Sequence, residues 1–273
     1  MEPEHPFFSL EWPPRAHTAR SMRPRLLALA LHLALTTFAC HSHEAPRSPR
    51  TRVLFVGNSY TSVNDLPSHL RALGDAMNDP FDVEAVAPGG ATLRMHLANA
   101  GVLAKIRDGH FQFVVLQGQS QEPLMQPRDF VDAGKELAAA VQAAGAVPVF
   151  YETWARRAGE ADYRAAWTGG SPTVMQERLR SRYREVAQAS GARVAPVGDA
   201  LERAETLDGS LTYYAPDGSH PSPLTTCLAA AVLFDTMRSR AALDTPVPAW
   251  GLDDREARFV ERVAHDLVDP PMR

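Results

Sequence analysis

Three residues of this chain have the types and spacing that nucleophilic catalysis requires. Ser59 lies in the segment GNSYT, residues 57–61, which directly follows a short apolar run. Near the C-terminus, Asp217 and His220 lie three positions apart in the sequence DGSHP. A carboxylate at that spacing can hold an imidazole in one tautomer, and the imidazole can then take the proton of a serine hydroxyl. Each segment alone is also typical of a turn or a helix cap, because Asn, Asp and Ser favour both.

Two further segments carry groups that can stabilise the negative charge of a tetrahedral intermediate. Gly89 and Gly90 follow a second apolar run, and a glycine pair allows close backbone approach with a free N–H. The third apolar run ends in QGQSQ, where Gln117 and Gln119 carry side-chain amides that can donate to an oxyanion. Each segment also suits a plain surface turn. A phosphate cradle fits residues 57–61 less well, because that segment has one Gly and no Lys.

Apolar runs alternate with helical patterns along most of the chain. The runs that predict strands are residues 52–57, 81–86, 111–117, 147–151 and 193–197. The patterns that predict helices are residues 66–77, 93–106 with a break at Gly101, 130–144, 174–190, 223–240 and 253–268. This alternation predicts an α/β fold, a three-layer α/β/α sandwich around a five-stranded parallel sheet. Working groups of such sheets gather at the carboxyl ends of the strands, where Ser59, Gly90 and Gln117 fall.

The order of these four segments resembles that of the SGNH (GDSL-like) hydrolase family over about residues 52–240. The first segment looks closest to bacterial members that read G-N-S-[FY]-T. The resemblance implies the flavodoxin-like SGNH fold, with Ser59 as the nucleophile, His220 as the base and Asp217 as the partner that orients the base. The chain has no G-x-S-x-G segment, which counts against the α/β-hydrolase fold.

The resemblance also implies an oxyanion hole, made by the N–H of Ser59, the N–H of Gly90 or its neighbour, and one side-chain amide. Two departures from the family pattern affect the site. Asn58 stands where the family motif has Asp, and the third segment reads QGQS instead of G-x-N-D. That segment is similar to the Q-G-E-S block of sialate and xylan O-acetylesterases. Gln117 or Gln119 would replace the missing Asn, and the sequence leaves both open.

The activity that the resemblance implies is hydrolysis of carboxylic esters through an acyl-enzyme, with no metal or cofactor. An exported enzyme meets extracellular polymers first, so the expected substrates are small-molecule or polysaccharide esters, above all acetyl esters of carbohydrates. Two alternatives stay open: a non-catalytic ligand-binding lipoprotein on the same fold, and a lipase or thioesterase of the same family. A flavodoxin-like nucleotide binder is disfavoured, because it gives Asp217 and His220 no role.

Composition excludes several other classes of protein. Of the 273 residues, 45% are hydrophobic and 22% are charged, and these proportions exclude global disorder. A formal net charge of −4 does not favour a nucleic-acid partner. Two cysteines cannot form a disulfide framework or a four-thiolate zinc site. Cys227 lies in an apolar helical pattern and is expected to be a buried core thiol.

The first forty residues predict a targeting segment. The apolar run at 26–39 is too short to span a bilayer, and two arginines precede it, so it fits a secretory signal. Met22 would be the natural start of such a signal. The run ends at Cys40, in a sequence that resembles a bacterial lipobox with a lipidated cysteine. An ordinary secretory signal with an incidental cysteine is the alternative.

These patterns divide the chain into three parts. Residues 1–40 are expected to be an upstream extension plus signal peptide, residues 41–51 a polar tether, and residues 52–273 the catalytic domain. The protein is expected to be exported, as a lipoprotein anchored to a bacterial membrane through Cys40 or as a secreted or periplasmic protein. Cys40 is the only point at which we expect contact with a membrane.

Overall fold

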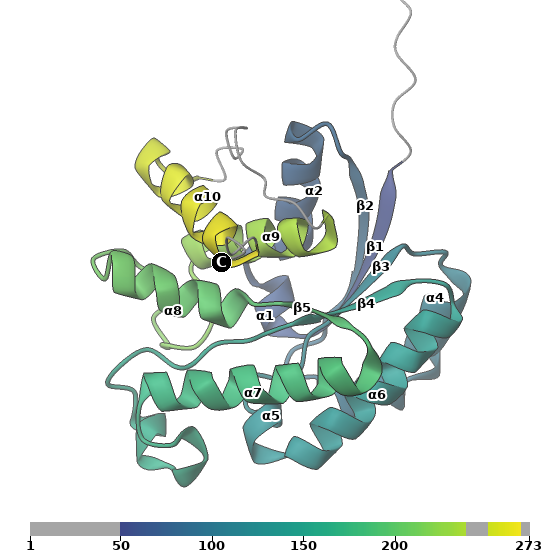
Figure 1. Cartoon of the computed structure of the whole chain (residues 1–273), viewed down its shortest axis with the longest axis horizontal. Helices are drawn as coiled ribbons and strands as arrows, with labels where there is room; N and C mark the ends of the chain where they lie inside the picture. The colour runs from purple at the N-terminus through teal and green to yellow at the C-terminus, as the bar shows by residue number, and fades with distance from the viewer. Residues whose placement is uncertain (1–49, 239–250, 269–273) are drawn as a thin grey trace, which may run out of the picture. The chain divides into compact units, whose positions relative to one another are not determined.

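Five parallel strands form one sheet with the order β2-β1-β3-β4-β5 (Figure 1). The strands are β1 (Thr51–Val56), β2 (Phe81–Val86), β3 (Phe113–Leu116), β4 (Val147–Tyr151) and β5 (Arg193–Ala195). The computed structural model describes residues 50–238 and 251–268, all of which fall in one unit, Pro46–Arg273. This strand order is the flavodoxin-like one, so the predicted fold class is confirmed.

The three central strands end at the same level of the sheet. Val56, the last residue of β1, pairs with Val86 of β2 and with Leu116 of β3. The chain order reverses between β1 and β3, and ligand sites of open α/β sheets lie at that reversal. The segments that follow Val56, Val86 and Leu116 therefore start side by side at the edge where a site is expected.

Two layers of helices cover the sheet because its strands are apolar on both faces. One face packs against α2 (Leu66–Ala76), α8 (Val197–Leu207), α9 (Pro223–Arg238) and α10 (Asp254–Val268). The other face packs against α3 (Leu93–Leu97), α4 (Ala100–Asp108), α6 (Pro127–Ala143) and α7 (Pro172–Ser190). Alternate residues of β1 divide between the faces, with Phe55 in the first core and Leu54 in the second. Figure 1 shows the helical layers on opposite sides of the sheet.

Helix α9 is buried on all sides. Every residue from Leu224 to Met237 is buried, because α9 packs against α2 and α8 and is also covered by α10. A largely apolar helix that is buried on every side is typical of a core element. Cys227 is fully buried in it, which confirms the prediction of a core thiol. Among the described residues, no helix is long and apolar enough to cross a membrane.

The main differences from the sequence predictions concern α8, the segment 93–106 and the third strand. The pattern predicts no helix over residues 197–207, where the structure has α8, because the buried stripe of α8 consists largely of small residues between acidic ones. The break predicted at Gly101 lies earlier, between α3 and α4, because the Asn99 side chain caps the start of α4. The third strand is four residues long and not seven. The predicted start at Met22 and the lipidation site at Cys40 lie outside the described residues.

Candidate active site

Ser59 is the first residue of the short helix α1 (Ser59–Ser62), directly beyond the end of β1. Asn58 caps this helix, and its side-chain oxygen accepts from the N–H of Tyr60 at 3.1 Å. Gly57 is required by close packing, because a Cβ there would lie 2.5 Å from Thr61 Oγ1 and 2.8 Å from Gln117 Oε1. The sequence therefore places Ser59 at the sheet edge in a fixed, half-buried position.

Asp217 and His220 complete a chain of hydrogen bonds that ends on Ser59. His220 Nε2 lies 2.9 Å from Ser59 Oγ, and His220 Nδ1 lies 2.5 Å from Asp217 Oδ2. The other carboxylate oxygen of Asp217 accepts the backbone N–H groups of Ser219 and His220, each at 3.0 Å. The structure therefore brings together the three residues that the sequence singled out, in the geometry of a nucleophile, a base and an orienting acid.

The charge of Asp217 suits the role of orienting acid. Partial burial alone would raise its pKa, but the hydrogen bonds from the His220 ring and from the Ser219 and His220 backbone lower the pKa of Asp217 to about 2. The carboxylate is therefore ionised across the range in which an imidazole titrates. An ionised partner fixes Nδ1 as the protonated nitrogen of His220 and leaves Nε2 free to accept the Ser59 proton.

The loop that carries Asp217 and His220 is attached to the rest of the fold from two sides. The Trp154 indole N–H donates to the carbonyl of Ser219 at 3.0 Å, and the Tyr60 hydroxyl lies 2.7 Å from Ser219 Oγ. Tyr60 also stacks on Trp154 with a centroid distance of 4.6 Å and meets the His220 ring edge-on at 5.4 Å. Trp154 is therefore a buried support of the loop that carries Asp217 and His220.

Two backbone N–H groups meet the requirement for oxyanion donors. Neither the N–H of Ser59 nor that of Gly90 has an acceptor among the described residues. Gly90 has φ of +73° in an open turn, so the turn needs glycine there. A free N–H at each of these strand ends can stabilise a developing negative charge beside Ser59.

His96 anchors α3, the helix that directly follows the loop of Gly90. It lies in α3, is buried, and bonds through Nε2 to the carbonyl of Gly57 at 2.7 Å. Burial lowers the pKa of His96, so the imidazole is neutral and donates from Nε2. This histidine holds α3 against the Ser59 loop. Among the residues that the structure describes, no cluster of His, Cys, Asp or Glu could hold a metal ion.

The structure removes Gln117 from the candidate oxyanion donors. Its Oε1 accepts from the backbone N–H of Asn58 and from Thr61 Oγ1, each at 3.0 Å. Its Nε2 donates to Asn58 Oδ1 at 3.0 Å and to the carbonyl of Gly118. Both amide protons are therefore engaged, and the side chain is fully buried. Gln117 supports the nucleophile loop from below, and this is the correction to the sequence prediction.

Gln119 keeps the geometry of a candidate donor. Its Oε1 accepts from the backbone N–H groups of Gln121 at 2.7 Å and Glu122 at 3.1 Å, which fixes the orientation of the amide. Its Nε2 contacts Ser120 Oγ at 3.3 Å. An amide nitrogen has two protons, so one remains for another acceptor. Of the two glutamines that the sequence left open, Gln119 is the one with an amide proton to offer.

Glu122 connects the second and third loops of the site. Its carboxylate accepts the N–H of Leu93 at 3.0 and 3.1 Å and the N–H of Gln119 at 2.9 Å. The side chain is only 2% exposed. Burial raises the pKa of Glu122, although the bonds from the Gln119, Leu93 and Arg94 backbone oppose the shift. The sequence analysis missed this residue, because a Glu before Pro at the start of a short helix is typical of a plain helix start.

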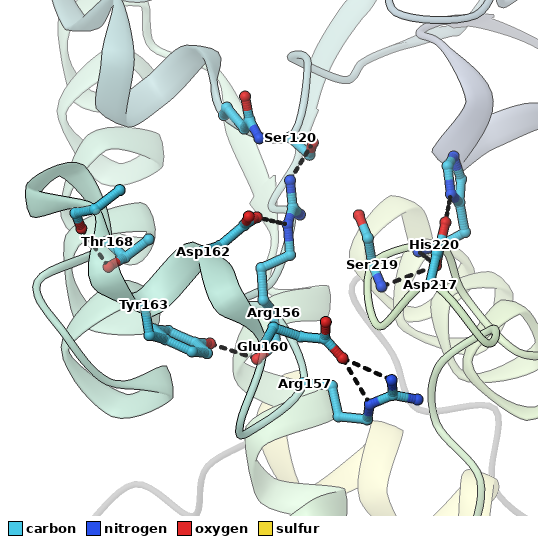
Figure 2. A network of polar contacts seen from close by, with 12 residues as sticks. Ser120, Arg156, Arg157, Glu160, Asp162, Tyr163, Thr168, Asp217, Ser219 and His220 are labelled. Carbon is cyan, nitrogen blue, oxygen red and sulfur yellow. Dashed lines mark hydrogen bonds and ion pairs between the residues drawn. The ribbon is translucent and has the colours of Figure 1, made fainter.

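Arg156 is the second functional residue that the sequence did not reveal. It follows β4 and is 4% exposed, and its guanidinium contacts Tyr60 OH at 2.7 Å, Ser120 Oγ at 3.0 Å and Asp162 at 3.1 Å. Figure 2 shows this guanidinium between Ser120 and Asp162, with Tyr163 bonded to the Arg156 backbone carbonyl. The signal that points to Arg156 is its place after a strand end, in the connection at residues 152–172.

Comparison with known proteins bears on the fold and the family of the chain. No family model and no curated protein matches the chain. Among solved structures, a protein assigned as an SGNH hydrolase from Slackia heliotrinireducens is 34% identical with a TM-score of 0.61, and the match covers 69% of this chain and 100% of that one. A DUF4886 family protein from Bacteroides uniformis is 17% identical with a TM-score of 0.67, over 82% of this chain and 97% of that one.

A third solved structure has the same fold at lower similarity. It is an acetyl-xylooligosaccharide esterase from Geobacillus, 14% identical with a TM-score of 0.50, and the match covers 71% of this chain and 94% of that one. The full-length match at 34% identity carries the assignment to a family, while the G-N-S-[FY]-T subgroup stays a prediction. The chain therefore belongs to the SGNH (GDSL-like) hydrolase family of serine esterases.

Proposed function

We propose that the protein hydrolyses short-chain esters of carbohydrates through an acyl-enzyme on Ser59. The observation that carries this proposal is the continuous contact from Asp217 through His220 to Ser59, with 2.9 Å between His220 Nε2 and Ser59 Oγ. This distance lies within the reach that a general base needs. It also removes the premise of the binding-protein alternative, which requires Ser59 and His220 to be out of reach of each other.

Acylation begins with attack of Ser59 Oγ on the ester carbonyl carbon. The Ser59 proton moves to His220 Nε2, and the carbonyl electron pair moves to the oxygen. The oxyanion lies against the free N–H groups of Ser59 and Gly90 and the Gln119 amide, and each such donor contributes about 3 kcal/mol. The intermediate then collapses, its bond to the alcohol breaks, and His220 returns the proton to the leaving alcohol.

Deacylation repeats these steps with water. Water loses a proton to His220 Nε2 as it attacks the acyl carbon, and collapse of the second intermediate releases the acid and restores the Ser59 hydroxyl. Asp217 stabilises the imidazolium in both halves of the reaction. Half-exposure of Ser59 and His220 leaves the site open to water and to bulky alcohols. An open site is consistent with a polymeric or oligomeric substrate.

Three observations support a short acyl group and a carbohydrate alcohol. The Tyr60 ring meets His220 edge-on, stacks on Trp154 and accepts a hydrogen bond from the buried Arg156 guanidinium, which makes a filled and partly polar wall on this side of the site. Such a wall disfavours a long apolar acyl chain. The QGQS segment is similar to that of O-acetylesterases, and the Geobacillus neighbour is an esterase of acetylated xylooligosaccharides. We further propose export of the enzyme, with Cys40 as a lipid anchor or with release after signal cleavage.

The first test measures p-nitrophenyl acetate hydrolysis by the full chain, with Ser59→Ala and His220→Ala beside it. We expect both variants to lose activity while keeping the wild-type circular dichroism spectrum, because Ser59 supplies the nucleophile and His220 the base. A fluorophosphonate probe should label the wild type at Ser59 and leave Ser59→Ala unlabelled. A folded wild-type protein that neither turns over the ester nor reacts with the probe would contradict the proposal.

Acyl length separates the proposed substrate class from a lipase or thioesterase of the same family. We expect kcat/KM to be higher for the acetyl ester than for the octanoyl ester, and O-acetylated xylan oligosaccharides to release acetate. A preference for octanoyl esters would favour the lipase or thioesterase alternative.

A further inference from the structure

Arg156 joins the loop of the nucleophile to the loop of the side-chain oxyanion donor. Its Nη1 donates to the hydroxyl of Tyr60, the neighbour of Ser59, at 2.7 Å. Its Nη2 donates to Ser120 Oγ, the neighbour of Gln119, at 3.0 Å. These partners lie 96 and 36 positions away in the sequence, so no local element could set the distance between the two loops.

The burial of this guanidinium calls for an explanation. A charged side chain that is 4% exposed loses its hydration, and a protein keeps such a group only where paired bonds replace the water. Asp162 is the acidic partner, at 3.1 Å, and it is itself partly exposed. Burial raises the pKa of Tyr60 although Arg156 opposes the shift, so the phenol is neutral and accepts the Arg156 N–H. The planar guanidinium, held by Asp162, therefore donates to two acceptors at once, the Tyr60 hydroxyl and Ser120 Oγ.

The contact with Ser120 extends to the proposed oxyanion donor. Ser120 Oγ accepts from Arg156 Nη2 at 3.0 Å and from Gln119 Nε2 at 3.3 Å. The carbonyl end of the same Gln119 amide is held by backbone N–H groups. Because both ends of the amide are held, the direction in which the second Nε2 proton points is fixed. The Arg156 guanidinium sets that direction through Ser120, and Figure 2 shows Ser120 beside the guanidinium.

We propose that Arg156 is a positioning residue of the reaction, which aligns the Gln119 amide with the Ser59 nucleophile through Ser120 and Tyr60. The inference rests on the proposed function, because it assigns a role within the same ester hydrolysis. Arg156 touches neither the substrate nor the reacting atoms. Its loss should therefore lower kcat and leave KM near the wild-type value, since the alignment matters most in the transition state.

The test compares Arg156→Met, Ser120→Ala and the double variant with the wild type. Methionine keeps much of the volume and removes the charge, and the Asp162 carboxylate that loses its partner is partly exposed, so water can solvate it. We expect Arg156→Met to lower kcat about 100-fold, the cost typical of a small misplacement of reacting groups. We expect Ser120→Ala to lower kcat in the same direction, and the double variant to be no slower than Arg156→Met, since both act through one contact.

Arg178→Met is the matched control. Arg178 is exposed and braces the same connection from α7 through the carbonyls of Ala166 and Trp167, without reaching Ser120 or Tyr60. We expect this variant to keep the wild-type kcat. An equal loss of kcat in Arg178→Met would show that the arginines merely brace the loop, and would overturn the inference.

Each remaining outcome decides the question. A kcat of Arg156→Met close to that of the wild type, a rise in KM alone, or additive losses in the double variant would overturn the positioning role.

If Arg156→Met does not fold, Ser120→Ala and Tyr60→Phe test the same chain of contacts, and unchanged kcat in both variants would overturn the positioning role. If the wild type hydrolyses the ester and Ser59→Ala does not, the proposed function holds, and a negative result with Arg156→Met overturns only the positioning role of Arg156. A folded wild type that is inert to ester and probe overturns the proposed function and this inference together.

Discussion

The two sides of the Ser59 site are built in opposite ways. On one side, Asp217 and His220 are three positions apart, Asp217 is exposed, and its carboxylate binds the backbone of its own loop. On the other side, Gln117 and Glu122 are buried and bind residues 59 and 29 positions away. The acid–base pair is held by local contacts and is open to water, whereas the residues that support the oxyanion loops are buried and bind partners far away in the sequence.

The difference shows which polar groups remain available for chemistry. A buried amide must have every donor and acceptor satisfied, so Gln117 uses both amide protons to hold Asn58 and the backbone. A group at the half-exposed edge, such as Gln119, keeps a proton for an incoming acceptor. The buried side therefore contributes rigidity, and the edge contributes the reacting groups. Each prediction below separates these two contributions.

The largest effect is expected on the local side. Asp217→Asn should lower kcat about 10⁴-fold, because an amide at this place favours the wrong tautomer of His220. The measurement is kcat for p-nitrophenyl acetate together with the thermal midpoint, which should change little at an exposed position. Asp208→Asn is the control, since Asp208 is an acid that binds Ser210 and Arg255 away from the site. A kcat of Asp217→Asn within tenfold of the wild type, which is about 1.4 kcal/mol, would contradict the triad assignment.

The next effect concerns the proposed side-chain donor. Gln119→Ala should lower kcat roughly 100-fold, the loss typical when one oxyanion donor is removed. The free energy of unfolding should fall by about 1 kcal/mol or less, because the N–H of Gln121 is half-exposed and the N–H of Glu122 keeps its bond to the Gln119 backbone carbonyl. Gln121→Ala, in the same loop, is the control for the local backbone. Unchanged kcat in Gln119→Ala would leave the two backbone N–H groups as the oxyanion hole.

Gln117 should give the opposite result, with stability as the main loss. Gln117→Leu leaves the Asn58 N–H and the Thr61 hydroxyl without their buried acceptor, so the free energy of unfolding should fall by roughly 2 kcal/mol. Gln142→Leu is the control, since Gln142 is exposed and bonds only the Ser190 carbonyl. Chemical denaturation measures the change. A large loss of kcat at full stability would restore Gln117 as an oxyanion donor.

The same division explains what the sequence could predict. Asp217 and His220 can be predicted as a pair because their contact is local. The D-x-x-H spacing indicates the contact without knowledge of the fold. Strands β1, β3 and β4 can be predicted because buried parallel strands are continuous apolar runs, and β2 because its apolar and polar residues alternate. The choice between Gln117 and Gln119 cannot be predicted from the sequence, because both are glutamines in one loop. Only the fold shows which side-chain amide has all its hydrogen bonds made within the protein.

Arg156 and Glu122 mark the limit of such prediction. Each binds groups on other loops of the sheet edge, and neither belongs to a spacing pattern within its own segment. Helix α8 was missed for a related reason, since its buried face consists largely of small residues and is recognisable only against the core it covers. Local chemistry and long apolar runs are therefore predictable, and contacts that depend on the order of the strands are not.

The smallest effect is a pH dependence of stability on the buried side. Burial raises the pKa of Glu122, so the folded state binds its proton more tightly than the unfolded state does. The free energy of unfolding should therefore fall as pH rises above about 4.5, the ordinary value, until the raised pKa is passed. Glu122→Gln, which does not ionise, should lack this part of the slope when both proteins are denatured across the same pH range. The quantity to follow is the free energy of unfolding of the wild type minus that of Glu122→Gln. If this difference does not change with pH, or increases as pH rises, the backbone N–H groups outweigh the burial of the carboxylate and the prediction is wrong.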